Sequence, residues 1–561
     1  MKKINKISIF LFLLLGVAFT SCETTDLDLL DDPNQITNDN GNLDFFLNSI
    51  QLDYASFIRR IGRNGAQLSR VEYMFGRTYE NNYQPVASDG IWSTAYAGMF
   101  SDMAIARPLA ESQEAFMHLG VMDVLQAHTL LTLVDFYGDV PYSEAANPAD
   151  FPNPNLDDDA SVYEAAIGLL DSGINYLQQG GSLATDLFYG NDEDKWIDLA
   201  NSLKMGAYVN TRLVDGNAMS KFNAIVNSGK YISSTSGDFQ FQYGTSETAP
   251  DTRHPAYSAD YTATGAGRYR SNWLMDAMLN DDDPRRRYYF YRQFGCTPGA
   301  VDVNGNDCGT DQQRLICSTQ ARPGHYPSEN DMVFCSVDSG YWGRDHGNAE
   351  GIPPDNFRRT VVGVYPAAGN FDDADVNGNG YDQVNQAVGG QGAGILPIML
   401  SSWTELMRAE MALANGNTGS ARTLLESALT TSISKVQGFG SVDPDGDLSA
   451  APSSAEVAAF ITAKGAEFNG ADSNGKWNIL AVQHFVAHYG NGIETYNFYR
   501  RTGFPRTLQF NIEPSSGNFI RSFLYSANEA NLNFNIPQKP NVDVQVFWDN
   551  NPPSPGFPFA N

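Results

Sequence analysis

Six consecutive residues concentrate side chains suited to binding a hydroxyl-rich ligand: Tyr341-Trp342-Gly343-Arg344-Asp345-His346. A flat aromatic ring packs against the apolar side of a pyranose ring, while charged or amide groups hydrogen-bond the hydroxyls around its edge. Tyr341, Trp342, Arg344 and His346 are therefore candidate ligand-binding residues. In the alternative interpretation, these side chains close a junction between the loop and the rest of the fold.

Four cysteines lie close together downstream of the N-terminal region: Cys296, Cys308, Cys317 and Cys335. In an oxidising compartment, an even and clustered set predicts two disulfides, and all three ways of pairing four cysteines remain open. A zinc site that combines these thiolates with His325 or His346 is the alternative. It is less favoured because the segment has no C-x-x-C pair.

Oxygen-bearing side chains alternate along one acidic stretch, as in a calcium-binding loop: Asp373, Asp375, Asn377 and Asn379. Gly378 stands at the sixth position of the stretch, as in an EF-hand, but Val384 stands where the bidentate glutamate would be. Surface turns produce similar strings. A structural Ca²⁺ is thus a candidate here, and no other cofactor is expected.

Catalytic patterns are poorly represented. A glycosidase needs two carboxylates at a fixed separation across a cleft, but Glu405 and Glu410 fall within a helical pattern that packing explains. The sequence has no G-x-S-x-G, H-E-x-x-H or phosphate-binding loop. These features favour a binding protein over an enzyme.

The N-terminus predicts export and lipid attachment. Lysines precede an apolar run from Ile7 to Phe19 that is too short to span a bilayer, so residues 1–21 are predicted to be a signal peptide. Cys22 resembles the lipidated cysteine of a bacterial lipoprotein, although Phe19 replaces the usual leucine. Residues 22–42 are polar and acidic, which is typical of a flexible tether. An acylated Cys22, carrying chains such as palmitate, would anchor the chain to a membrane.

The formal net charge of −29 over 561 residues limits the partners. Such a surface repels nucleic acid and phosphate-rich headgroups, so no nucleic-acid partner is expected. Acidity is common in secreted bacterial proteins and does not identify a ligand.

One stretch predicts the element around which the rest packs. From Ala115 the chain is apolar on every face of a helix, which indicates a central helix. Gly138 and Pro141 then predict a sharp elbow. A structural role explains this elbow best, with Asp139 accepting backbone hydrogen bonds and Tyr142 packing on the helix.

Helical periodicity and loop composition predict one all-α domain over residues 43–561. Helical pairs are expected at about 43–230 and 396–505, and the second set resembles tetratricopeptide repeats because Ala421, Leu425 and Ala428 have the small–large–small spacing. An irregular, loop-rich half at about 231–395 carries the candidate ligand-binding residues, and a tail at about 506–561 is expected to lie extended on the body.

Several stretches, in order, carry a family resemblance: LDLLDDPN after Cys22, VDFYGDVPYSEA, RPGHYPSEN, SGYWGRDHGNAEGIPPD, LPIMLSSWTELMRAEMAL, YNFYRRTGFP and FWDNN. Together they resemble the SusD/RagB family of nutrient-binding outer-membrane lipoproteins from Bacteroidetes. The resemblance covers nearly the whole chain after the signal peptide.

This resemblance implies a surface-exposed, lipid-anchored protein of the outer membrane that delivers an oligosaccharide to a SusC-like TonB-dependent transporter. Some relatives bind peptides, so an oligopeptide ligand is an alternative, as is a structural helical-repeat scaffold. Trp92 corresponds to a place where glycan-binding relatives display an aromatic ring, and Tyr96 follows one helical turn later. Both are therefore further candidate binding residues.

Overall fold

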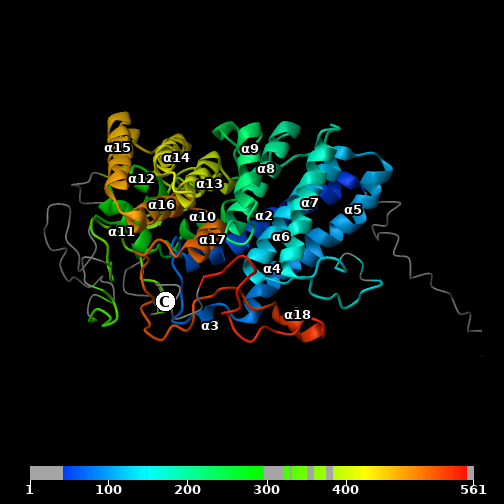
Figure 1. Ribbon diagram of the computed structural model, residues 1–561. Helices are drawn as coiled ribbons and strands as arrows, with labels where there is room; N and C mark the ends of the chain where they lie inside the picture. The colour runs from blue at the N-terminus through cyan, green and yellow to red at the C-terminus, as the bar shows by residue number, and fades with distance from the viewer. Residues whose placement is uncertain are drawn as a thin grey trace, which may run out of the picture. The chain divides into compact units, whose positions relative to one another are not determined.

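The computed structural model describes residues 42–145, 147, 149–295, 317, 320–327, 332–349, 359–374 and 383–551. Its compact unit spans Leu43–Asn561. Within the described ranges, helices dominate and strands form two sheets of two short strands each (Figure 1). The predicted helical fold is confirmed. The predicted signal peptide, Cys22 and all of the tether except Asn42 lie outside the described residues.

Helix α6, Phe116–Tyr137, is the central helix that the sequence predicts. From Met117 to Tyr137, only Gln126 is not buried. The helix is long and apolar enough to cross a membrane, yet 94% of its apolar window is covered by the rest of the fold. It packs closely on α7, Asp159–Leu177, because Gly120 meets Gly173: a Cβ on Gly120 would lie 2.6 Å from Leu177 Cγ.

The elbow after α6 is a structural connection. Gly138 adopts a positive φ of 72°, a conformation that favours glycine, and so lets the chain leave the helix. Asp139 Oδ1 accepts a hydrogen bond from the backbone N–H of Asp159 at 3.0 Å, as predicted. Asp157 accepts from the backbone N–H groups of Tyr142 and Ser143. The elbow therefore fixes the start of α7 against the end of α6.

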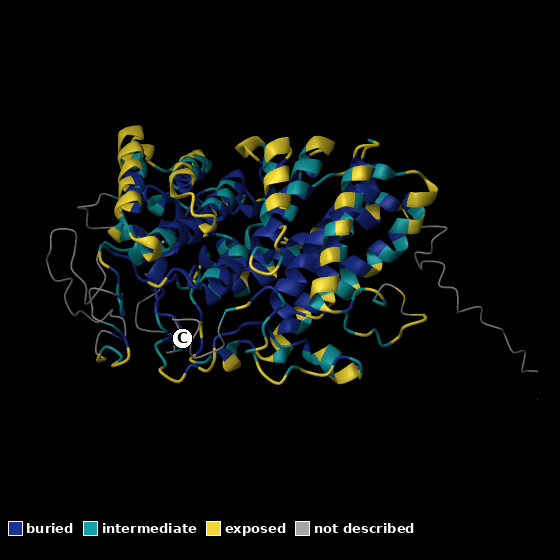
Figure 2. Ribbon diagram, in the orientation of Figure 1, coloured by how far each residue is buried: buried dark blue, intermediate teal, exposed yellow. Residues whose placement is uncertain are grey.

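The N-terminal helices cover one side of α6. Their bounds are α2 Leu43–Leu68, α3 Tyr79–Asn82, η1 Pro85–Ser88, α4 Asp89–Trp92, the π-helical segment η2 Ser93–Phe100 and α5 Ser101–Ser112. Residues at helical spacing form an apolar stripe on α2 that is entirely buried: Phe46, Ile50, Tyr54, Phe57 and Ile61. Figure 2 shows buried residues gathered where the helices face one another and exposed residues on their outer sides.

The next segments lead into the irregular half. Their bounds are α8 Glu193–Thr211, α9 Ala218–Ser228, η3 Thr235–Gly237, β1 Phe239–Gln242, α10 Pro255–Asp260, α11 Asn272–Asn280, α12 Arg286–Tyr289, β2 Phe290–Tyr291, β3 Val361–Val362 and β4 Ile395–Met399. Strand β4 pairs antiparallel with β1. The sequence pattern wrongly extended a helix back to Leu396, because a short apolar run buried on every side has no periodicity that separates strand from helix.

Tetratricopeptide-like helices follow. Their bounds are α13 Ser401–Ala414, α14 Thr418–Gly438, η5 Phe439–Val442, η6 Leu448–Ala450, α15 Ser454–Gly470, α16 Ser473–Ala487 and α17 Ile493–Thr502. Ala421, Leu425 and Ala428 are buried in the cluster that joins α14 to α13, as their spacing predicts. The periodicity of residues 477–498 predicts one helix, but the structure has two, α16 and α17, because the chain leaves the helix between His488 and Gly492.

The described part of the C-terminal segment, up to residue 551, lies on the helical body. Apart from α18, Ala527–Leu532, it is irregular and runs beneath α4 and α6 in the view of Figure 1. Phe523 N–H donates to Phe136 O at 2.7 Å, and the indole N–H of the buried Trp548 donates to Asp135 Oδ1 at 2.8 Å. The tail thereby covers polar groups at the end of the central helix.

Candidate ligand-binding site

The predicted sugar-binding loop is largely built into the protein core. Trp342 has no exposed surface, its backbone N–H donates to Thr360 Oγ1 at 2.8 Å, and its ring packs edge-on against Phe294. Tyr341 is also buried, with the guanidinium of Arg292 over its ring at 5.1 Å. A stacking role for these two rings is therefore wrong for this structure, because neighbouring side chains cover both of them.

His346 and its neighbour Asp345 belong to the same buried junction. Asp345 accepts hydrogen bonds from the side chains of Asn272 and Gln509 and from the backbone N–H of Cys335. Burial, and then the charge of Arg70, lower the pKa of His346 well below its usual value, so the imidazole is neutral. The prediction of a ligand contact at His346 is thus replaced by a role in closing the loop against the body.

Trp92 and Tyr96 hold α4 and η2 against the elbow. The Trp92 ring is buried against Tyr137 and Tyr525, at centroid distances of 5.4 Å and 5.8 Å. The Tyr96 hydroxyl donates to the carbonyl of Pro141 at 2.9 Å. Trp92 has no free face for a sugar, which corrects its predicted stacking role. The half-buried Tyr96 is engaged by the elbow.

Arg344 is the member of the predicted loop that reaches a cavity. An isolated parallel bridge joins Ser271 to Arg344, and the Arg344 backbone N–H donates to Arg270 O at 3.0 Å. This pairing places Arg344 beside a cavity of about 420 Å³. The cavity is lined by Arg63, Gln67, Glu72, Tyr73, Phe75, Gly267, Arg268, Tyr269, Arg270, Arg344 and Arg359.

Aromatic rings and guanidinium groups meet in this cavity. The guanidinium carbons of Arg344 and Arg359 lie 4.1 Å and 4.0 Å from the ring centroid of Tyr269. Tyr73 meets Tyr269 edge-on with centroids 6.1 Å apart, and its hydroxyl donates to the carbonyl of Asn348. Phe75, at the rim, leaves 57% of its surface exposed. The cavity thus contains the combination of aromatic and polar groups that the sequence predicts for the loop 341–346.

The sequence patterns described above do not include Tyr73, Phe75 or Tyr269. The sequence does contain a signal for Tyr269, because this tyrosine stands between Arg268 and Arg270. The same combination of aromatic residue and arginine makes Trp342 and Arg344 candidates. The triplet of residues 268–270 by itself does not show that an isolated bridge between Ser271 and Arg344 brings it beside Arg344.

One disulfide is present among the described residues. Cys317 and Cys335 are bonded, with Cα atoms 5.5 Å apart. The pair packs with Trp342, so it pins the segment that precedes the buried loop. Bonded sulfurs do not ligate zinc as thiolates, which excludes these two from a zinc site. Cys296 and Cys308 lie outside the described residues, and their pairing stays a prediction.

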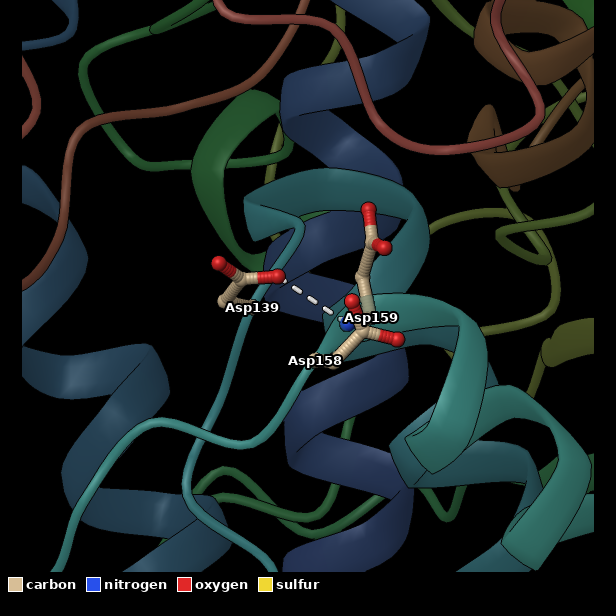
Figure 3. Close-up of side chains that lie close together, drawn as sticks. All are labelled: Asp139, Asp158 and Asp159. Atoms are coloured by element: carbon tan, nitrogen blue, oxygen red, sulfur yellow. Dashed lines mark hydrogen bonds between the residues drawn. The ribbon is translucent and has the colours of Figure 1, made fainter.

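Two acidic groups have the composition of metal sites. Of the predicted calcium loop, only Asp373 is described, while Asp375, Asn377 and Asn379 lie outside the described residues. In the elbow, carboxylate oxygens of Asp139, Asp158 and Asp159 lie within 4.8 Å of one another (Figure 3). Asp158 accepts from Ser161 N–H and Asp159 accepts from Phe547 N–H. The elbow acids therefore cap α7 and hold the tail.

The architecture defines a class: a helical-repeat protein in which irregular segments and helix α2 line a cavity of about 420 Å³. Residues 33–333 match a SusD-like family model described as starch-binding and associating with the outer membrane. Residues 379–540 match a second model, described as Susd and RagB outer membrane lipoprotein. The chain belongs to the SusD-like family, which comprises nutrient-binding proteins of the outer membrane.

Solved structures agree with the family assignment. A SusD homologue from Bacteroides uniformis is 17% identical, with a TM-score of 0.59, and covers 90% of this chain and 100% of its own. A chitin-binding protein is 19% identical, with a TM-score of 0.64, over 91% and 100%. A SusD/RagB family protein from Bacteroides thetaiotaomicron is 16% identical, with a TM-score of 0.62, over 91% and 99%. No curated protein matches the chain. At these identities the likeness concerns the fold.

Proposed function

We propose that the cavity around Tyr269 binds an oligosaccharide without transforming it. The observation that supports this most is the position of Tyr269, whose ring lies within 4.1 Å of two guanidinium groups and beside the exposed ring of Phe75. The exposed ring of Phe75 provides contact area for a sugar ring, and the guanidinium groups held over Tyr269 can donate to ring hydroxyls or substituents. The chitin-binding relative supports a glycan ligand through its shared fold.

The chain then acts as the capture component of an uptake system. We propose that Cys22 is acylated, that the protein is exposed at the cell surface, and that it passes its ligand to a SusC-like TonB-dependent transporter. The family description as an outer membrane lipoprotein supports the anchor. Labelling cells with a palmitate analogue tests it: Cys22→Ala is expected to lose the label and leave the membrane fraction, whereas equal labelling of both forms contradicts acylation there.

Calorimetry on the purified mature protein tests ligand binding. The panel contains neutral and acidic oligosaccharides together with short peptides. For any glycan that binds, Tyr269→Ala is expected to weaken binding about tenfold to a hundredfold, because truncating a central aromatic contact costs about 1–3 kcal/mol. Tyr176→Ala, on α7 outside the cavity lining, is the matched control. Binding of peptides alone would replace the proposed ligand class.

A further inference from the structure

Arginines gather around the proposed binding cavity and its neighbours. Two further cavities, of about 50 Å³ and 450 Å³, share Arg63 with the first one. We call the combined lining of the three cavities the arginine groove. Six of its residues carry the positive charge that matters here: Arg59, Arg60, Arg63, Arg268, Arg344 and Arg359. Glu72 is the one carboxylate that lines it among the described residues. The groove is therefore strongly cationic.

The positive charge comes from two directions. Arg59, Arg60 and Arg63 lie near the C-terminal end of α2, where i and i+4 neighbours share a face of the helix. Arg268 faces them from the segment that follows α10 and lines two of the three cavities. Arg63 approaches Glu72 at 3.7 Å, but that pair is half-exposed and therefore weak.

Among the described residues, no carboxylate forms a hydrogen bond or ion pair with the guanidinium groups of two of these arginines. In the part of the chain that the structure describes, no hydrogen bond or ion pair involves the guanidinium of Arg59 or Arg268. Burial lowers the pKa of Arg59, Tyr243 and Glu72 act in the opposite direction, and the like charges of Arg60 and Arg63 lower it further. Burial also lowers the pKa of Arg268, and the like charges of Arg63 and Arg270 add to this, while Glu72 and Asp260 act in the opposite direction. Their mutual repulsion is an electrostatic cost to the free protein.

This concentration is unusual for the chain as a whole. The protein has 65 acidic and 36 basic residues, so carboxylates were abundant enough to neutralise a structural arginine. The deeper Arg270 shows such neutralisation, because it pairs with the buried Asp260 at 2.7 Å. Within the described residues, Arg59, Arg63 and Arg268 have Glu72 as the one carboxylate that lines the cavities with them. A bound anion would relieve their repulsion, whereas a neutral ligand would not.

We infer that the arginine groove selects an anionic oligosaccharide, one whose sugar rings carry carboxylate or sulfate groups. The inference rests on the proposed glycan-binding function and names its ligand class. Guanidinium groups bind carboxylates and sulfates through paired, charge-assisted hydrogen bonds, while Tyr269 and Phe75 provide the ring contacts. Neutral glycans would gain only the ring contacts.

Matched probes test the inference by calorimetry on the mature protein. One pair is an oligogalacturonate and a neutral galactan oligosaccharide of equal length, and the other is a sulfated carrageenan oligosaccharide and its desulfated form. At least one anionic member is expected to bind at least tenfold more tightly than its neutral match. Raising NaCl from about 50 mM to about 300 mM is expected to weaken that binding, because salt screens exposed charges. The probe pair whose anionic member binds more tightly shows whether the groove prefers carboxylate or sulfate groups.

Charge-removing variants locate the effect. Arg59→Gln and Arg268→Gln are each expected to weaken anionic binding about tenfold, as expected for the loss of a charge-assisted hydrogen bond, and to leave neutral glycans unaffected. Arg422→Gln on α14 removes the same charge outside the groove lining and is the control. Unfolding midpoints verify that each variant is folded.

The outcomes separate this inference from the function on which it rests. Equal, salt-insensitive affinity for neutral and anionic members would overturn the anionic class and leave oligosaccharide binding in place. Binding of an acidic peptide, such as oligoglutamate, with no glycan would overturn both. Unchanged anionic binding in the Arg59 and Arg268 variants would move the anion away from the groove and overturn the inference.

Discussion

Arg501 donates to both carboxylate oxygens of Glu410, with Nε–Oε1 and Nη2–Oε2 distances of 2.8 Å, and both side chains are fully buried. Arg212 approaches the same carboxylate at 3.0 Å. Burial acts to raise the pKa of Glu410, but Arg501 and Arg212 outweigh it, so the net shift is downward and the group stays ionised. This pair joins α17 to α13, and it explains Glu410 as a structural residue.

We therefore expect Arg501→Met to destabilise the protein by about 3–5 kcal/mol in urea denaturation, because it leaves a buried carboxylate without its main partner. The control is Arg422→Met, since Arg422 and Glu426 form a partly exposed pair whose loss is expected to cost at most about 1 kcal/mol. Adding Glu410→Met to Arg501→Met is expected to recover part of the loss. Equal costs for the two single variants would contradict the assigned role.

Trp342→Ala is expected to destabilise the fold by about 3–5 kcal/mol, because it leaves a cavity among side chains that fully bury the ring. Thermal unfolding measures the change, and Trp342→Phe is expected to cost less because it retains most of the ring volume. If Trp342→Ala kept full stability but lost ligand, the buried position of this ring would be wrong.

Phe75→Ala is expected to show the opposite pattern, with weaker glycan binding and little change in stability, since 57% of the residue is exposed at the cavity rim. The loss is expected to be about tenfold for a rim aromatic. Phe45→Ala is a matched control, because Phe45 is 70% exposed at the start of α2 and does not line the cavity. Affinity lost equally in both variants would argue against a specific contact.

Acid is expected to destabilise the protein through its buried histidines. Burial lowers the pKa of His128, His254 and His488 to about 3 each, from an ordinary 6.5. The unfolded chain gains protons below about pH 6.5 that the folded protein excludes. The stability that comes from keeping these histidines neutral is therefore complete above about pH 6.5, and it is lost progressively as the pH falls towards 3.

The loss at pH 5 is about 2 kcal/mol for each such histidine. His128→Gln retains an acceptor for the Tyr54 hydroxyl, which lies 2.6 Å from His128 Nδ1. Urea denaturation at pH 7.5 and pH 5 is expected to show a smaller pH difference in this variant than in the wild type. His118→Gln, at a partly exposed pair with Asp44, is the control. An unchanged pH difference in His128→Gln would show that His128 takes up its proton in the folded state.

Removing the Cys317–Cys335 disulfide by a double serine substitution is expected to cost about 2–4 kcal/mol, because the unfolded chain gains the freedom that closing an 18-residue separation removes. Thermal unfolding with and without reductant measures this cost. Reductant is expected to shift the wild type towards the variant. A variant as stable as the oxidised wild type would show that the bond does not stabilise the loop.

The sequence by itself determined the helical body. Local periodicity located the stripe of α2, the spacing of α14 located its packing face, and the apolar composition of α6 showed that neighbours surround it. Each of these follows from side chains only a few residues apart, since an α-helix repeats every 3.6 residues. Gly138 and Pro141 fixed the elbow for the same reason, because their conformational limits are local.

Only the tertiary structure decided which candidate side chains reach a ligand. Trp342 and Arg344 are two positions apart, yet one is sealed behind Phe294 and the other reaches a cavity beside Tyr269. The arginine groove likewise joins α2 to segments around residues 268 and 344. Burial and electrostatic potential at a residue depend on neighbours hundreds of positions away, so composition and spacing identified the type of binding side chain and the fold selected which ones are available.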